Sequence, residues 1–341
     1  MRSLCLSIIL ILLLLLAPPP VQANDTIGRV GAGGIELLKS DSIAMVDEVL
    51  EISTKSIRVH YRFRNESTED IQTTVAFPMP PYGWKAGQAA GEVNIGPLKG
   101  FRLWVNGQAV PVQPHRAAML GDRDITGQLR QIGLSDEQIF DTFGGCHQDG
   151  NPSVICEISG EQRDEIAKIG GMDSECPAWK VAETAYWEQL FPAGKDVEIE
   201  HEYPPFVGGS YSIPYQRRHG YTAGNDIPTT SRYSKDEACL NDDGRQAILR
   251  RVHEQAQSGA GWVMVDLHDV EYILGTGRNW KGPIRNFTLR LRKESPDQVV
   301  SLCFPGQAKR LDPLTLEFSQ KDFTPPDRLV VYFYSVEGKA E

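Results

Sequence analysis

Histidine is the side chain most often used for proton transfer and metal binding near neutral pH, and this chain carries seven. No two are spaced as HxH or HExxH, so a zinc hydrolase has little support. His60 and His201 fall on strands that we expect to be neighbours, where they could meet, although a hydrogen-bonded strand histidine is the simpler interpretation. The full set is His60, His115, His147, His201, His219, His253 and His268.

Serine, glycine and acidic motifs give no stronger signal. Ser153 and Ser210 lie outside GxSxG, and Gly208-Gly209-Ser210 lacks the second glycine of a nucleophile elbow. Gly275-Thr276-Gly277 is a lone GxG with no helical pattern behind it, which argues against a nucleotide site. The acids within 241–244 miss the glutamate spacing of an EF-hand, and a helix N-terminus explains them better. We therefore expect no cofactor and no metal.

Trp280, which follows Asn279 in a glycine-punctuated loop, is the best candidate for an aromatic ligand platform. It could serve a carbohydrate-binding module, but a tryptophan folded over the edge of a sandwich is the simpler interpretation. An alternative function is a hydrolase acting on glycan or peptide at the junction of two domains. That hypothesis requires two or three of four residues to converge in one cleft: His201, Glu202, Asp266 and Trp280.

The cysteines indicate disulfides rather than a metal or redox site, because none forms a CxxC pair. We expect Cys239 to pair with Cys303, tying the helix near Asp242 to a sheet. Cys146 could pair with Cys156 across a polar loop, which would leave Cys176 free. Disulfides of this kind belong to an oxidising compartment.

Residues 1–23 have the pattern of a cleavable signal peptide. Arg2 precedes the apolar run Leu4–Ala17, and Ala23 before Asn24 fits a cleavage site. The run of 14 residues is shorter than the ~20 that span a bilayer, so we expect no retained transmembrane segment; an uncleaved anchor is the alternative. A net charge of −10 argues against nucleic-acid partners. The sequence thus predicts a periplasmic protein.

Alternating apolar residues predict that the chain is mainly β. Ile57–Arg64 and Ile71–Phe77, joined by six polar residues, are predicted to pair as an antiparallel hairpin. Asn106-Gly107 predicts a second hairpin. Glu198, Glu200 and Glu202 form an acidic row that faces solvent, or the basic row Arg58, Arg62 and Arg64.

Helical spacing and capping boxes at Ser135 and Ser159 indicate a helical insertion at about 115–179. Helical spacing returns at 242–257, and 210–235 reads as a surface loop. Leu329–Val336 is typical of a strand buried on both faces. We predict two β-sandwich-like domains, 24–216 with the insertion and 217–341 with one helix.

Several segments resemble a bacterial family of exported proteins known as domain of unknown function four-four-two-four. They are Tyr61–Asn65, Val75–Pro80, Tyr186–Gly194, His201–Tyr203, and Tyr272–Leu274 with Asn279–Ile284. The resemblance covers nearly all of the chain after residue 23 and implies compartment rather than activity.

The order of strands, hairpin and helix up to Tyr203 is also similar to the VIT domain, a β-sandwich involved in protein interactions. The long insertion departs from that pattern and puts any shared partner surface in doubt. No catalytic residues come with either resemblance. The function expected is a non-enzymatic binding or assembly module of the cell envelope, with an unidentified envelope protein or glycan as partner.

Overall fold

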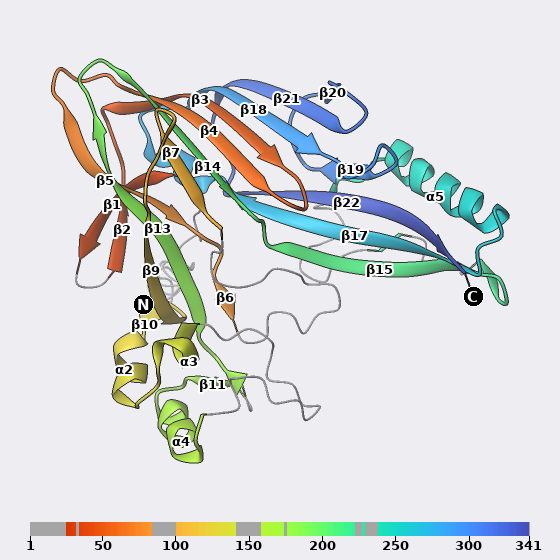
Figure 1. Cartoon of the computed structure of the whole chain (residues 1–341), viewed down its shortest axis with the longest axis horizontal. Coiled ribbons are helices and arrows are strands. Elements are labelled where there is room, and N and C mark those ends of the chain that lie inside the picture. The colour runs from red at the N-terminus through yellow and green to blue at the C-terminus, as the bar shows by residue number, and fades with distance from the viewer. Residues whose placement is uncertain are drawn as a thin grey trace, which may run out of the picture.

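A computed structural model describes residues 25–31, 34–83, 100–140, 158–173, 176–221, 227–228 and 238–340. The chain is mainly β, as predicted, with three large sheets and a two-stranded ribbon of β11 (Met172–Asp173) and β12 (Cys176–Pro177) (Figure 1). The predicted leader at 1–23, the Ala23/Asn24 cleavage site, and Cys146 and Cys156 lie outside the described residues.

The eight-stranded sheet joins the first and last thirds of the chain, because β18 runs parallel to β3. Strands from both sides of the predicted domain boundary at residue 216 therefore share one sheet. The position of that boundary stays a prediction. In spatial order its strands are β20 (Lys309–Arg310), β21 (Thr315–Phe323), β18 (Ile284–Arg292), β3 (Ile43–Ile52), β4 (Ile57–Asn65), β14 (Asp196–Tyr203), β7 (Arg102–Val105) and β8 (Gln108–Ala109).

The seven-stranded sheet carries the N-terminal strands at one edge. In spatial order it contains β10 (Arg123–Asp124), β9 (Gln113–Leu120), β13 (Lys180–Phe191), β5 (Ile71–Pro78), β1 (Thr26–Gly31) and β2 (Gly34–Leu38), with β6 (Tyr82–Gly83) also paired to β13.

The five-stranded sheet extends past the ends of β3 and β4 towards helix α5 (Asp242–Gln257) (Figure 1). Its order is β16 (Gly220–Tyr221), β15 (Val207–Gln216), β17 (Trp262–Ile273), β22 (Arg328–Lys339) and β19 (Val299–Leu302). β22 is buried on both faces, as predicted: Phe333 faces the main core and Tyr332 faces the core under α5. The loop predicted at 210–235 is wrong for 210–216, which belong to β15.

The predicted hairpin of Ile57–Arg64 and Ile71–Phe77 is wrong in its pairing. Both segments are strands, but β4 pairs with β3 and β14, whereas β5 pairs with β13 and β1. The connection crosses from one sheet to the other and is held by the buried Asn65, whose Nδ2 donates to the carbonyls of Glu69 and Phe191 at 2.8 Å. Phe63 and Phe77 consequently enter one core from two different sheets.

In the described part of the predicted helical insertion, 115–179, there are three helices, α2 (Thr126–Gln131), α3 (Asp136–Phe140) and α4 (Gly160–Lys168). Its predicted start is wrong, because residues up to Leu120 belong to β9. Both capping boxes form, at Ser135 with Gln138 and at Ser159 with Gln162. The helices have a small core of their own at the far end of β9 and β13. Trp179 anchors them, because its indole N–H donates to the carbonyl of Ile139 at 3.1 Å.

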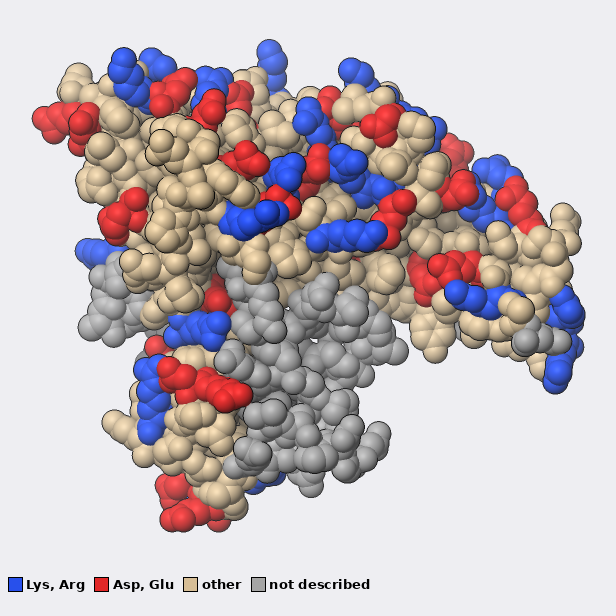
Figure 2. Space-filling view, in the orientation of Figure 1, with Lys and Arg blue, Asp and Glu red and all other residues tan. Residues whose placement is uncertain are grey.

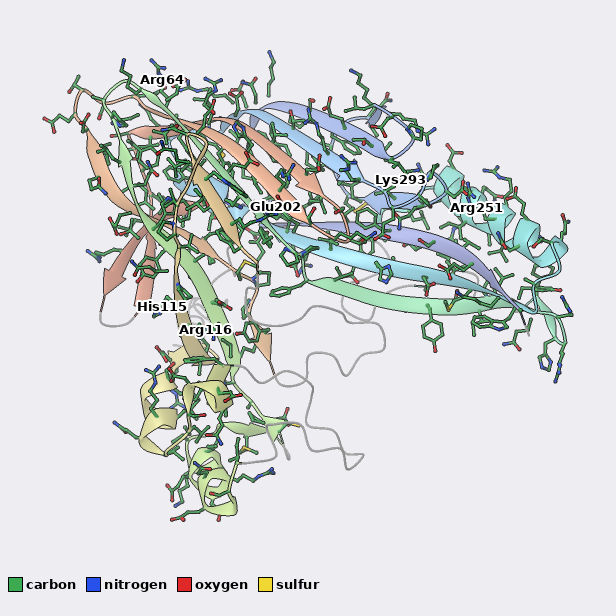
Figure 3. All side chains as sticks on the ribbon, in the orientation of Figure 1. Arg64, His115, Arg116, Glu202, Arg251 and Lys293 are labelled. Atoms are coloured by element: carbon green, nitrogen blue, oxygen red, sulfur yellow. A yellow bond between two sulfur atoms is a disulfide. The ribbon has the colours of Figure 1, made fainter. Side chains whose placement is uncertain are left out.

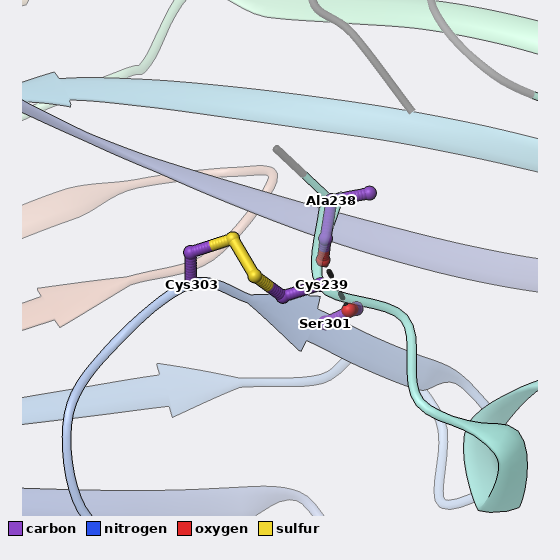
Figure 4. Close-up of a disulfide and its surroundings, with 4 residues drawn as sticks. All are labelled: Ala238, Cys239, Ser301 and Cys303. Carbon is purple, nitrogen blue, oxygen red and sulfur yellow. Dashed lines mark hydrogen bonds between the residues drawn. A yellow bond between two sulfur atoms is a disulfide. The ribbon is translucent and has the colours of Figure 1, made fainter. Parts of the chain in front are cut away.

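A disulfide joins Cys239 to Cys303, the pair preferred on sequence grounds (Figure 4). It connects the segment before α5 to the end of β19, and the hydroxyl of Ser301 donates to the carbonyl of Ala238 beside it. Cys176 is a buried free thiol. The disulfide therefore fixes α5 against the five-stranded sheet.

Glu66, which follows β4, forms ion pairs with Lys281 at 2.9 Å and with Arg285. Hydrogen bonds from Lys281 and then Arg285 lower the pKa of Glu66 from 4.5 to about 2. Because the folded pKa is lowered, this stabilisation is present above pH 4.5 and is lost as the pH falls towards about 2. We expect Glu66→Gln to lower the free energy of unfolding by under about 1 kcal/mol near neutral pH, since the pair is partly exposed. In acid titrations followed by circular dichroism, Glu69→Gln in the same turn should behave as wild type; equal curves for Glu66→Gln and wild type would contradict the prediction.

Candidate functional site

His201 on β14 is enclosed in the main core and makes an ion contact with Asp25, just before β1. Both side chains are 0% exposed, and Nε2 of His201 lies 3.3 Å from Oδ1 of Asp25. The rings of Phe77, Phe101 and Tyr61 have centroids 4.6, 5.2 and 5.4 Å from the imidazole. Burial raises the pKa of Asp25, and the charge and hydrogen bonding of His201 oppose that rise. The pair is positioned to hold the N-terminal segment, not to meet a substrate.

Trp280 and Asn279 hold the same segment from the other side. Asn279 ends the 3₁₀ helix η3 (Gly275–Asn279), and its Nδ2 donates to Oγ1 of Thr26 at 3.0 Å. The indole N–H of Trp280 donates to the carbonyl of Asp25 at 2.7 Å, and its ring lies 4.4 Å from that of Phe63. Trp280 is only 3% exposed. The hypothesis of a ligand platform at these two residues is therefore corrected: both are packing and anchoring residues.

Glu202 points to the opposite face of β14 from His201. Its carboxylate pairs with Arg58 at 2.8 Å and with Arg102 at 2.9 Å. The strand register places Glu202 beside Arg58 and Glu198 beside Arg62, which confirms that the acidic row meets the basic row. Basic and acidic side chains alternate along the upper part of the face in Figure 2.

His60 and His201 lie on adjacent strands but on opposite faces, so they do not meet. His60 is register partner to Glu200, and His201 to Val59. The side chain of His60 is 40% exposed, with Nε2 3.9 Å from Oε2 of Glu198. The imidazole of His60 thus belongs to the charged outer surface.

Asp266 lies in a different part of the molecule, so the four-residue cleft of the hydrolase hypothesis does not form. It projects from β17 into a groove of about 390 Å³ where the five-stranded sheet runs past the eight-stranded one. Figure 3 shows Glu202 near the middle of the molecule and Arg251, a groove residue, at its α5 end. The groove is formed by α5, β17, β22 and the connection from β18 to β19.

The floor and one wall of the groove present hydrogen-bonding groups of several kinds. Asp266 and His268 alternate on β17 and share a face, and Ser335 on β22 is register partner to Asp266. On the wall, Nε2 of Gln298 donates to Oγ of Ser335 at 3.1 Å. The same amide accepts the backbone N–H of Glu294 at 3.0 Å through its oxygen. Gln298 is 5% exposed, so its amide is fixed before any ligand arrives.

The carboxylates of the groove are in unequal environments. Burial raises the pKa of Asp266, and the nearby charge of Glu337 raises it further. The hydrogen bond from Thr54 lowers the pKa of Glu294, and Lys55 and His268 add to that effect. The pKa values of the two carboxyl groups are therefore shifted in opposite directions.

No hydrogen bond joins His268 to Asp266 or Ser335 in the part of the chain that the structure describes, so no proton relay of the triad type is present there. Within the same residues, no three His, Cys, Asp or Glu side chains are placed to hold a metal ion. The arrangement suits binding of a polar ligand through carboxylate, imidazole, hydroxyl and amide groups.

A larger groove, of about 790 Å³, lies between α2 and α4 and is a weaker candidate. Its charged side chains Lys168 and Glu165 pair with each other and are 66% and 49% exposed. Gln162 is already occupied by the Ser159 cap and by the carbonyl of Gly133. Long exposed side chains of this kind must be ordered on binding, at a cost in conformational entropy.

Comparison with known families gives one match, to the domain of unknown function DUF4424, over residues 23–332. The chain belongs to the DUF4424 family. A search among curated proteins finds no significant match. A crystal structure from Legionella pneumophila subsp. pneumophila str. Philadelphia 1, described as a candidate nutrient binding protein, is similar at a TM-score of 0.42 and 16% identity, covering 91% of this chain and 72% of that one.

The DUF4424 match includes all three large sheets and most of the groove, from Arg251 to Gln298. Ser335 and Glu337 follow the matched region, although β22 itself begins inside it. In the described part of this DUF4424 chain, no helix has both the length and the apolar composition of a membrane span.

Sequence reasoning named Asp266 but missed His268, Glu294, Gln298 and Ser335. The strict alternation within Trp262–Ile273 could have placed Asp266 and His268 on one face of a strand. Glu294 and Gln298 belong to a turn-rich segment with no motif, and Ser335 lies on a strand about 70 residues further along, so only the fold brings these DUF4424 residues together.

Proposed function

We propose that this DUF4424 protein is a non-enzymatic binding module of the bacterial cell envelope that takes a polar ligand in the groove at the open end of its sheets. The observation that carries the proposal is the set of mixed hydrogen-bonding groups on Asp266, His268, Gln298 and Ser335 around one groove, in which Gln298 and Ser335 are held by hydrogen bonds. Such sites orient a ligand through a few polar groups that are already in place.

The cellular location is part of the proposal. The leader-like pattern of residues 1–23 supports export, and the Cys239–Cys303 disulfide suits the oxidising periplasm. The VIT-like order of elements supports an interaction role rather than a catalytic one.

The proposal is tested by photo-crosslinking in intact cells. A photoreactive amino acid at Arg251, on the groove, should give a reproducible adduct, detected by mass spectrometry of the recovered protein. As a control, the same photoreactive amino acid is placed at Arg290. Arg290 also pairs with an acidic residue, but it lies on the eight-stranded sheet, away from the groove. Adducts confined to Arg251 are expected.

The double change Asp266→Ala and His268→Ala should then reduce the adduct at Arg251 by about tenfold or more, because two polar contacts to the ligand are lost. The matched control is His60→Ala with Glu198→Ala, an exposed imidazole and carboxylate elsewhere on the surface. Equal adduct yield from both double variants, or no reproducible adduct, would overturn the proposal.

A glycan hydrolase is the second candidate, favoured by the opposite pKa shifts of two carboxyl groups in one groove. Glycosidases need one carboxyl group that stays protonated as an acid and one that stays ionised. Asp266 would be the acid and Glu294 its partner. Release of reducing ends from isolated peptidoglycan, lost on Asp266→Asn, would favour this enzyme over the binding module; no release is expected.

A further inference from the structure

An exposed tyrosine lies on β15, one strand beyond the groove residues of β17. Tyr211 on β15 is 55% exposed and is the register partner of Asp266 on β17, which in turn faces Ser335 on β22. Directly paired residues of antiparallel strands point to the same face, and adjacent strands lie ~4.8 Å apart. Tyr211, Asp266 and Ser335 therefore form a row of about 10 Å across the sheet, which Gln298 continues at the wall.

The neighbouring row leaves space beside this tyrosine. His268 lies between Gly209 and Phe333 in the register, and Gly209 has no side chain to cover the tyrosine ring or the imidazole. A single exposed tyrosine is ordinary on a protein surface. Here the tyrosine shares a face of the sheet with Asp266, and the same row continues through Ser335 to Gln298 in the groove.

This combination matches the chemistry of a sugar ring. A pyranose has apolar C–H faces that pack on an aromatic ring and hydroxyl edges that need both donors and acceptors. Tyr211 supplies the flat apolar face, Asp266 supplies an acceptor beside it, and Gln298 supplies a donor about 10 Å further along the row. The groove volume of about 390 Å³ falls within the range of small-ligand sites.

The charge of the groove selects among sugars. Five carboxylates line it: Glu254, Asp266, Glu294, Asp297 and Glu337. Two cations nearby are already paired, Arg251 with Asp297 and Lys339 with Glu337. Acidic sugars would be repelled by this surface, whereas neutral and amino sugars would not.

We propose that the groove binds a glycan of neutral or amino sugars, with one ring stacked on Tyr211 beside Asp266 and the hydroxyl groups of the following sugars bonded to His268 and Gln298. This inference rests on the proposed function and names its ligand class. A cationic peptide is the competing ligand, because a lysine ammonium can bind both carboxylates and a tyrosine ring. The sugar is favoured because its hydroxyl groups can use the donor amide of Gln298 as well as the carboxylates, whereas an ammonium group only donates.

The test is isothermal titration calorimetry of the purified protein with four probes: cellotetraose, the glucosamine tetrasaccharide, trigalacturonic acid and tetralysine. Binding of one of the first two is expected, with no binding of trigalacturonic acid. Tyr211→Ala should weaken that binding by about tenfold, and Tyr211→Phe should keep it within about threefold because the stacking face remains.

Tyr221→Ala is the matched control, because Tyr221 is 50% exposed on the neighbouring strand β16 and its hydroxyl lies 2.9 Å from Nδ1 of His253 instead of at the groove. The Tyr221→Ala variant should bind the sugar with the same affinity as the wild type. Binding of tetralysine alone, binding of no sugar, or equal affinity in Tyr211→Ala would overturn the glycan proposal. If adducts form at Arg251 in cells but the purified protein binds no sugar, the ligand class is wrong and the proposal of a binding module is still supported.

Discussion

Replacing His201 with alanine is expected to lower the free energy of unfolding by about 3–5 kcal/mol. The change removes the imidazole whose Nε2 lies 3.3 Å from Oδ1 of the fully buried Asp25, and leaving a buried polar or charged group without its partner is strongly destabilising. It also leaves a cavity among Phe77, Phe101 and Tyr61, whose rings surround the imidazole. Urea unfolding followed by tryptophan fluorescence measures the loss.

The pH dependence identifies the charge as the cause. Because burial already raises the pKa of Asp25 and His201 opposes that rise, the variant should raise it further. An acid whose folded pKa is raised stabilises the fold at low pH and loses that contribution as the pH rises through the folded pKa. His201→Ala should therefore recover part of its stability on mild acidification, before the other carboxylates protonate.

A second substitution separates charge from cavity. Adding Asp25→Asn to His201→Ala should recover at least about 1 kcal/mol, since the buried group is then neutral. His60→Ala, on the adjacent strand but 40% exposed, should change stability by under about 0.5 kcal/mol. If the double variant were no more stable than His201→Ala alone, the carboxylate of Asp25 would carry no charge in the folded protein.

The strands of the fold could be predicted from local alternation, whereas their partners could not. The rows Ile57–Arg64 and Ile71–Phe77 each predict a strand with one apolar face, and both strands form. Alternation specifies which face is buried but not which strand lies alongside, so a hairpin and a crossing between two packed sheets fit the same pattern. Asn65 decides between them through bonds to Glu69 and to Phe191, which is more than a hundred residues away.

Because local sequence does not specify which segments pack together, the functional residues could not be predicted either. Trp280 in a glycine-rich loop has the composition of an exposed platform, and only the docking of Asp25 against it makes it a core residue. β15 escaped prediction because its glycines, serines and Pro214 are typical of a loop, and pairing with β17 overrides that composition. Tyr211 lies on this strand, so the residue that carries the glycan proposal could not be singled out before the sheet was known.

Removing the Cys239–Cys303 disulfide is the second change with a large expected effect. The bond closes a loop with a sequence separation of 64, for which restricting the unfolded chain contributes about 4 kcal/mol. Cys239→Ala with Cys303→Ala should lower the free energy of unfolding by that amount. Amide exchange should rise first in α5 and β19, the elements that the bond connects.

Both cysteines must be changed together, because a single substitution would leave the other cysteine of the pair as an unpaired thiol. Cys176→Ala is the matched control and should cost about 1 kcal/mol, the loss typical of a small buried side chain. A reducing agent should destabilise the wild type and Cys176→Ala to the same extent, and should affect the double variant less. Wild-type protein that unfolds at the same urea concentration with and without reductant would contradict a stabilising disulfide, and α5 would then depend only on its packing of Ile248 and Val252 against β17 and β22.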